Sequence, residues 1–197
     1  VLYSKITKYI LYFVAYNALY INYEYNERAL IMIEEINIDI SSNINKEIIN
    51  NLFKAGNWHF GSDKILSTNV HKNDCGLTLD TGIHNNDILN TYANVIFYMV
   101  EKNTFMKFKK IERIRWNWYH SNSVMEFHED HVQDNKFSII YNLHDNDGGT
   151  EFKINDEIKF YQSEESKALF FPSKIEHRGI ATKKNVNRFC LNMVIEI

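Results

Sequence analysis

Hydrophobic and polar residues alternate along this chain in two periods, and the change of period separates a helical part from a strand-rich part. Residues 42–53 carry Ile and Leu at helical spacing, with a serine at the start of the run and Gly56 after it. Residues 85–102 repeat that spacing with Ile, Leu, Val, Tyr and Met, and residues 36–40 alternate as a short strand does. The pattern therefore predicts two helices that follow a short strand.

Beyond these helices the hydrophobic period becomes two, which is typical of β-strands. We expect strands at residues 111–119, 138–143, 153–160, 168–171 and 188–195. Residues 57–84 are rich in Gly, Asn, Asp, Ser and His, which favours loops with short strands at most. Several short strands after two helices indicate an antiparallel barrel or sandwich with helices packed on one face.

The N-terminal segment is the most hydrophobic part of the chain. Residues 9–21 are almost continuously apolar and aromatic, but the run is shorter than the roughly 20 residues that span a bilayer. Asn17 interrupts it, and no small-residue cleavage site follows. We expect a buried or packing helix and no membrane span. Residues 1–32 are therefore treated as an N-terminal extension, and residues 33–197 as one domain.

Composition and charge narrow the class of protein. The 197 residues are 45% hydrophobic and 24% charged, which indicates a folded domain with a real core. A net charge of -3 gives no electrostatic reason to expect nucleic acid as a partner. Cys75 and Cys190 lie far apart, which argues against a disulfide scaffold or a zinc ribbon. Reduced thiols favour the cytoplasm, or the host cytoplasm if the source is viral. No feature specifies an oligomeric state.

Three residues of metal-binding types stand out in the strand-rich part. His128 and Asp130 have the i, i+2 spacing that puts both side chains on one face of a strand, and His177 follows far downstream. A His-x-Asp alone is commonly a solvated turn. With a second histidine it becomes the ligand set of a non-haem iron facial triad, which leaves positions open for cosubstrate and oxygen. His131 lies three residues from His128 and should point away from the site.

Four segments of the C-terminal half resemble, in order, the iron(II)- and 2-oxoglutarate-dependent oxygenases, in particular the prolyl-4-hydroxylase-like group of phage and bacterial genomes. They are Tyr119 nine residues before His128, His128-Glu129-Asp130, the stretch Tyr141–Phe152, and Ala168–Ser173 followed by His177-Arg178-Gly179. The resemblance is close over residues 116–197 and loose over 33–115. It implies a double-stranded β-helix, a cupin-like jelly-roll barrel buttressed by N-terminal helices, with Fe(II) held by the two histidines and the aspartate.

Arg188 opens the last predicted strand. Its side chain should share the barrel interior with Cys190 and Asn192, because Phe189 and Leu191 form the opposite, apolar face. A guanidinium there needs an anionic partner, since an unpaired buried charge is costly. The resemblance implies that Arg188 anchors the far carboxylate of 2-oxoglutarate. An internal ion pair with Asp or Glu is the alternative.

The resemblance also implies roles for residues near the metal. It implies that the Tyr119 hydroxyl bonds the cosubstrate, although a buried tyrosine can equally be part of the core. Asn117, on the same strand face, and Ser138, at the start of the next strand, are weaker candidates for cosubstrate or substrate contacts. Arg178 follows a ligand histidine and could face the substrate.

The reaction implied by the resemblance uses 2-oxoglutarate and O2, releases succinate and CO2, and hydroxylates an unactivated C–H bond. The substrate would be a protein or peptide residue such as proline, with a small molecule as the second choice. Within that family, the retained carboxylate of Asp130 favours hydroxylation over halogenation. Two other classes stay open, which are a cupin-type metalloenzyme that does not use 2-oxoglutarate and a non-catalytic jelly-roll binding or virion protein.

Overall fold

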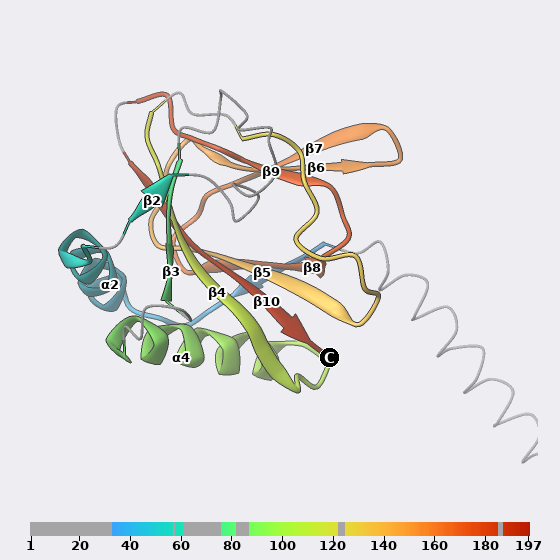
Figure 1. Ribbon diagram of the computed structural model, residues 1–197, viewed down its shortest axis with the longest axis horizontal. Helices are drawn as coiled ribbons and strands as arrows, with labels where there is room; N and C mark the ends of the chain where they lie inside the picture. The colour runs from blue at the N-terminus through green and yellow to red at the C-terminus, as the bar shows by residue number, and fades with distance from the viewer. Residues whose placement is uncertain (1–32, 57, 61–75, 82–86, 122–124, 185–186) are drawn as a thin grey trace, which may run out of the picture. The chain divides into compact units, whose positions relative to one another are not determined.

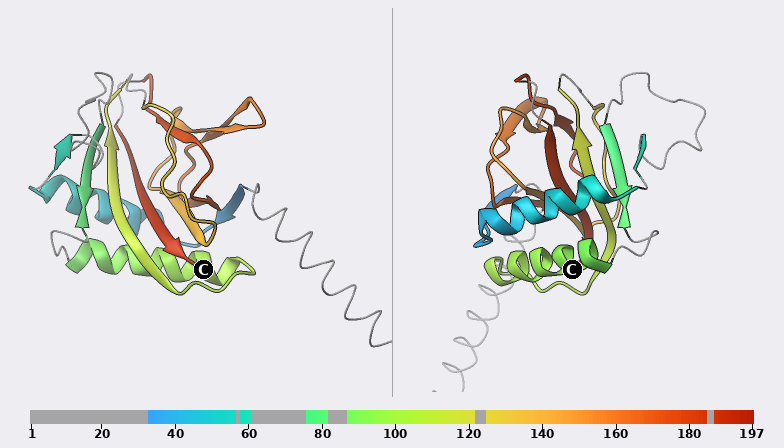
Figure 2. Two further views of the ribbon diagram at one scale, coloured as in Figure 1. Left: turned by 45° about the vertical axis from the view of Figure 1, so that its right-hand side comes forward. Right: turned by 90° about the vertical axis from the view of Figure 1, so that its left-hand side faces the viewer.

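The structure, a computed structural model, describes residues 33–56, 58–60, 76–81, 87–121, 125–184 and 187–197. Two antiparallel sheets face each other, as Figure 1 shows, and the space between them holds buried polar side chains such as those of His177 and Arg188. Helices α2 (Ser42–Lys54) and α4 (Asp87–Asn103) lie against the outer side of the larger sheet, and the two further views show both helices crossing beneath its strands (Figure 2). The helices predicted over residues 42–53 and 85–102 are thus confirmed.

Strands that are distant in sequence are neighbours in the larger sheet, which is the mark of a jelly roll. Its order is β1 (Glu34–Asn37), β8 (Lys167–Pro172), β5 (Lys136–Asn142), β10 (Arg188–Glu196), β4 (Lys110–Tyr119), β3 (Gly76–Asp80) and β2 (His59–Phe60). The smaller sheet has the order β7 (Glu157–Gln162), β6 (Gly149–Ile154) and β9 (His177–Ile180). The predicted fold class is confirmed. Among the described strands, however, the sheets do not join into a closed barrel.

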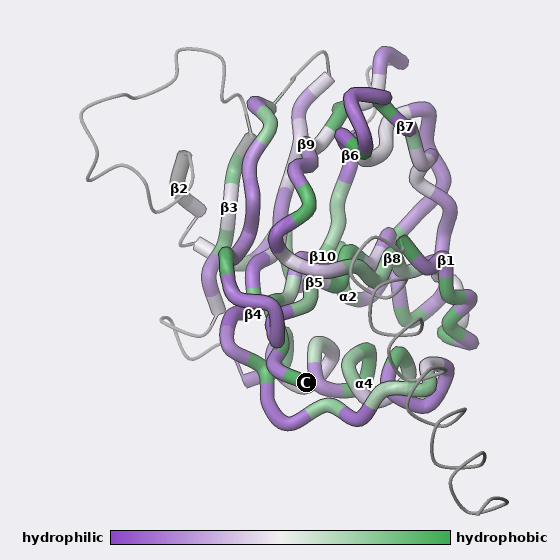
Figure 3. The backbone as a smooth tube through the Cα atoms, turned by 90° about the vertical axis from the view of Figure 1, so that its right-hand side faces the viewer, coloured by the Kyte–Doolittle hydropathy of each residue, from purple (hydrophilic) through white to green (hydrophobic). Residues whose placement is uncertain are grey.

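Alternation along the strands divides the apolar residues between two cores. Phe189, Leu191 and Met193 of β10 point to the helices, where they are buried with Leu52 of α2 and Ile96 of α4. Hydrophobic positions recur along α4 and along the strands above it in Figure 3. A second, smaller core fills the space between the sheets beside the polar interior. Burying one leucine or phenylalanine side chain stabilises the folded state by roughly 1.5–3 kcal/mol. The packing of α2 and α4 on the sheet therefore depends mainly on the first core.

The strand predicted over residues 153–160 is wrong. Strand β6 ends at Ile154 and β7 begins at Glu157, and the two pair as an antiparallel hairpin. Asn155 and Asp156 join them with positive φ angles of 51° and 64°. Asn and Asp tolerate this left-handed conformation better than most residues, and a two-residue turn of this kind matches the twist of paired strands.

The N-terminal helix expected at residues 9–21 lies outside the described residues, and so does much of the loop region at 57–84. In the part of the chain that the structure describes, no helix combines the length and apolarity needed to cross a membrane. The division into residues 1–32 and 33–197 and the cytoplasmic location stay predictions.

Candidate metal centre

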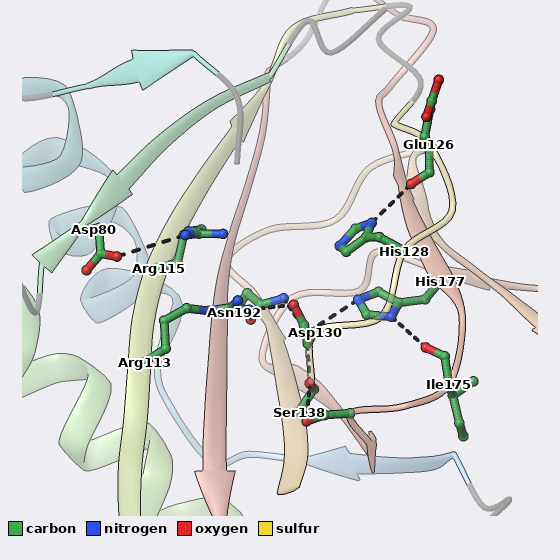
Figure 4. A network of polar contacts seen from close by, with 11 residues as sticks. Asp80, Arg113, Arg115, Glu126, His128, Asp130, Ser138, Ile175, His177 and Asn192 are labelled. Atoms are coloured by element: carbon green, nitrogen blue, oxygen red, sulfur yellow. Dashed lines mark hydrogen bonds and ion pairs between the residues drawn. The ribbon is translucent and has the colours of Figure 1, made fainter. Parts of the chain in front are cut away.

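The three predicted ligands converge between the sheets. One side-chain atom from each of His128, Asp130 and His177 lies within 4.8 Å of the others. The His128 and His177 backbones form a β-bridge, with N–H to O distances of 3.0 and 2.9 Å. The backbone N–H of Asp130 donates to Ser173 O at 3.0 Å. His128 therefore occupies a single bridge and not a strand, yet its side chain and that of Asp130 meet as expected (Figure 4).

Both imidazoles are oriented by backbone carbonyls. Nδ1 of His128 lies 3.0 Å from Glu126 O, and Nδ1 of His177 lies 2.9 Å from Ile175 O. A carbonyl only accepts, so each Nδ1 carries a proton, and Nε2 is the atom of each ring that is left to bind a metal. The buried Nε2 of His177 has no hydrogen-bond partner among the residues that the structure describes, and it lies 3.4 Å from Asp130 Oδ2. Burial, together with His177, lowers the pKa of His128, which favours the neutral form that binds metal.

The carboxylate of Asp130 is held by three side chains. Arg113 forms an ion pair with Oδ1, while Ser138 Oγ and Asn192 Nδ2 donate to Oδ2 at 2.7 and 3.1 Å. Burial disfavours its ionised form, but the Arg113 guanidinium keeps the pKa of Asp130 well below its usual range. Two imidazole nitrogens and one carboxylate oxygen suit a divalent transition metal such as iron. The donor set therefore fits the ion that the sequence implied.

Two of these three supporting side chains were not among the predicted site residues. Arg113 and Asn192 lie on neighbouring strands β4 and β10, and strand alternation places both on the interior face. The alternation of interior and exterior positions along these strands could have identified both residues from the sequence. Ser138 was expected to contact cosubstrate or substrate. In the structure its hydroxyl bonds Asp130 and lies 2.9 Å from Ser173 Oγ.

Arg188 lies deep in the same interior, only 1% exposed. Its Nη2 donates to Thr150 Oγ1 at 3.2 Å and more weakly to Asn142 Oδ1 at 3.4 Å, while Nε and Nη1 have no hydrogen-bond partner in the described part of the chain. No carboxylate of the described residues forms an ion pair with it, so the alternative of an internal pair is not observed there. An uncompensated buried charge costs several kcal/mol. The guanidinium can therefore bind an anion. Thr150, which lies beside it, was not among the predicted site residues.

Tyr119 and Asn117 flank this guanidinium on β4. Tyr119 is paired in register with Arg188, whose guanidinium carbon lies 5.0 Å from the centre of the phenol ring. Burial raises the pKa of Tyr119, so its hydroxyl stays protonated and can donate. Asn117 is paired with Cys190 and interacts with its thiol, two register positions from the Tyr119–Arg188 pair and towards Asn192, which bonds Asp130.

Arg178 does not face the metal. His177 turns its side chain to the interior, so Arg178 points to the outer face of the smaller sheet. There its Nε and Nη2 donate to Glu151 Oε2 at 2.8 and 2.7 Å, and its guanidinium lies 4.4 Å from the centre of the Phe127 ring. This geometry does not favour the contact between Arg178 and substrate that the sequence analysis considered. His131, as expected, is not part of the ligand group.

The sequence matches no protein-family model and no curated protein. Its structure, in contrast, resembles many solved ones. A prolyl hydroxylase from Trichoplax adhaerens, solved with a peptide of hypoxia inducible factor, has a TM-score of 0.66 and 12% identity, over 91% of this chain and 92% of that one. A prolyl-4-hydroxylase from Pseudomonas putida has a TM-score of 0.63 and 10% identity, over 87% and 96%.

A third similar structure is SnoN, a non-haem α-ketoglutarate-dependent epimerase of nogalamycin biosynthesis. Its TM-score is 0.66 with 9% identity, over 87% of this chain and 82% of SnoN. At such identities the likeness establishes the fold, which is the double-stranded β-helix of iron- and 2-oxoglutarate-dependent oxygenases, prolyl-4-hydroxylases among them. For the fold, the resemblance drawn from sequence motifs is confirmed.

Proposed function

We propose that this protein is an Fe(II)- and 2-oxoglutarate-dependent dioxygenase that hydroxylates an unactivated C–H bond and releases succinate and CO2. The observation that carries the proposal is the buried Arg188, with donors unpaired, in the same interior as His128, Asp130 and His177. A metal site alone would equally suit a cupin-type enzyme. A separate buried cation additionally suits an acid with a second carboxylate.

The residues that would hold iron are His128 and His177 through Nε2 and Asp130 through a carboxylate oxygen. Bound iron would supply the activation of oxygen, which no protein side chain can provide. The protein's own part is orientation, because carbonyls fix both imidazoles and Arg113 and Ser138 fix the carboxylate. A site arranged in advance loses little freedom when the ion arrives.

The residues that would hold 2-oxoglutarate are Arg188, Thr150 and Tyr119. The guanidinium retains N–H donors for the distal carboxylate, and the protonated Tyr119 hydroxyl can donate to the same group. Asn117 stays a weaker candidate. The choice of 2-oxoglutarate as the ligand is supported by the similar structure of SnoN, which was solved with Fe3+ and α-ketoglutarate.

For the substrate we propose a residue of a protein or peptide, such as proline. The peptide bound to the Trichoplax adhaerens neighbour supports this choice. The alternative is a small molecule, since SnoN was solved with a nogalamycin compound. Titrating purified protein with peptides, free amino acids and nucleosides while measuring succinate would separate these classes by which one stimulates turnover.

The central test is an anaerobic titration with Fe(II) and 2-oxoglutarate. We expect a weak visible absorption band that needs both components, followed by conversion of 2-oxoglutarate to succinate when oxygen is admitted. Arg188→Met should bind Fe(II) but lose the band at the same 2-oxoglutarate concentration. Metal binding without any 2-oxoglutarate-dependent band in the wild-type protein would favour the cupin reading, and absence of metal binding would favour a non-catalytic jelly roll.

A further inference from the structure

The hydroxyl end of Tyr119 occupies space that a side chain at position 179 would need. A Cβ atom added to Gly179 would lie 2.6 Å from both Cζ and Oη of Tyr119 and 2.8 Å from its Cε1. Contacts below 3.0 Å are essentially never seen for real Cβ atoms. The phenol can therefore lie where it does only because residue 179 has no side chain.

The backbone of Gly179 does not itself require glycine. Gly179 belongs to β9, is paired with Thr150 of β6, and has no φ in the left-handed region. Alanine can adopt this extended conformation without strain. Contact with the Tyr119 ring is thus the constraint at this position, and an alanine substitution isolates that contact.

The ring that touches Gly179 also lies beside the unpaired guanidinium. Arg188 is 5.0 Å from the ring centre and donates to Thr150, the register partner of Gly179. Any displacement of the phenol from Gly179 changes the spacing between the hydroxyl and the guanidinium. These are the two groups that would grip a distal carboxylate from two sides.

We propose that Gly179 is a specificity-determining residue for the 2-oxo diacid. Because Gly179 has no side chain, the Tyr119 ring can lie against it and leave room for the second carboxylate. The inference rests on the proposed function and deepens it. A 2-oxo acid without a second carboxylate does not reach Tyr119 and Arg188, so its binding does not depend on residue 179.

The test compares wild-type protein with Gly179→Ala, both loaded with Ni(II) in place of iron. Calorimetry measures the affinity for Ni(II), for 2-oxoglutarate and for pyruvate. Gly179→Ala should bind 2-oxoglutarate roughly tenfold to a hundredfold more weakly, the range expected for impaired hydrogen bonds to a charged group. Affinity for Ni(II) and pyruvate should be unchanged. An equal loss for pyruvate, or no loss for 2-oxoglutarate, would overturn the inference.

A double-mutant cycle shows whether Gly179 acts through Tyr119. With Tyr119 present, Gly179→Ala should lower the melting temperature, because the new Cβ meets the ring. Leucine at position 119 lacks Cζ and Oη, so in a Tyr119→Leu background Gly179→Ala should change neither the melting temperature nor the remaining 2-oxoglutarate affinity. Equal effects in both backgrounds would contradict the inference. The melting temperature keeps the cycle readable even if Tyr119→Leu binds 2-oxoglutarate too weakly to measure.

Gly56→Ala is the matched control, because a Cβ there meets no atom within 4 Å. It should leave every affinity unchanged. The two proposals fail differently. Wild-type protein that binds Ni(II) but never 2-oxoglutarate refutes the proposed function, whereas wild-type and Gly179→Ala proteins that bind 2-oxoglutarate equally well refute only the role of Gly179.

Discussion

The two ends of the polar interior differ in how many of their polar side-chain atoms form hydrogen bonds or ion pairs with other groups of the protein. At the metal end, each ligand has its other polar atom bonded, with the imidazole Nδ1 atoms on carbonyls and Asp130 Oδ1 on Arg113. At the opposite end, Arg188 is more deeply buried than His128 or Asp130, yet its Nε and Nη1 have no hydrogen-bond partner among the described residues. One end is arranged before its ligand binds, and the other carries a charge that no carboxylate of the described residues neutralises.

This difference predicts opposite responses to truncation. Removing a group at the metal end breaks contacts that hold or orient the metal ligands, so metal binding weakens. The loss is larger for a group that contacts the ion than for one that only supports a ligand. Removing the guanidinium from the other end relieves an unpaired buried charge, so the apo protein should not lose stability. Truncation therefore weakens metal binding at one end, and at the other it weakens ligand binding without a loss of apo stability.

The largest effect should come from His177→Ala. It removes a ligand, so the affinity for Fe(II), Co(II) or Ni(II) should fall by roughly a hundredfold or more, beyond what loss of a supporting group costs. Titration of the apo protein with Co(II), followed by its visible spectrum, measures this. His131→Ala is the matched control, because His131 is outside the ligand group. Equal losses in the two variants would place the ion elsewhere.

Arg188→Met should separate the two ends most clearly. We expect 2-oxoglutarate affinity to fall roughly a hundredfold, since charge-assisted hydrogen bonds are lost, while metal affinity stays the same. The melting temperature of the apo protein should be unchanged or higher, because methionine fills similar space without a buried charge. Added 2-oxoglutarate with metal should raise the melting temperature of the wild type only. A strongly destabilised Arg188→Met would show that the protein itself compensates this charge.

Ser138→Ala tests whether orientation of the carboxylate matters at the metal end. Loss of the 2.7 Å hydrogen bond to Asp130 should weaken metal binding by roughly tenfold and leave 2-oxoglutarate binding to the metal-saturated protein intact. Ser163→Ala removes an equally buried hydroxyl that bonds His144 O instead. Calorimetry on both variants provides the comparison. The same metal affinity in both would mean that Arg113 and Asn192 suffice to hold Asp130.

The smallest effect is expected behind the ligand histidines, on the outer face of the smaller sheet. Arg178, fixed by Glu151, lies over Phe127, the residue before His128, and so helps to hold the His128 segment on β9. Arg178→Met should weaken metal binding roughly two- to fivefold, in line with a cation–π contact of about 0.5–1 kcal/mol.

Lys153→Met is the control for that variant, since the Lys153–Glu176 ion pair is also carried by β6 and the segment before β9 but is more exposed. It should leave metal affinity unchanged, as expected for an exposed ion pair. Hydrogen exchange at the backbone N–H of His128 gives a second measurement, and faster exchange is expected only in Arg178→Met. Equal exchange rates in the two variants would remove Arg178 from the support of the site.

Local periodicity correctly predicted the direction of side chains where that direction depends on a single strand or helix. The alternation over residues 188–195 placed Arg188 and Asn192 on the interior face, as β10 has them. It failed at residues 153–160, because Ile154 and Ile158 lie on either side of a turn and mimic one continuous strand. The Asn155–Asp156 pair was the signal for that turn, since both residues tolerate positive φ.

The sequence alone determined which chemistry the chain could carry. Histidine and aspartate two residues apart and an arginine in an apolar strand are local facts, because side-chain direction follows from the backbone geometry of each segment. Only the tertiary structure decided that His177 joins His128, that Arg113 holds Asp130, and that Arg188 has no carboxylate partner among the described residues. Those contacts join residues far apart in sequence, and their existence depends on strand order and register, which no local pattern specifies.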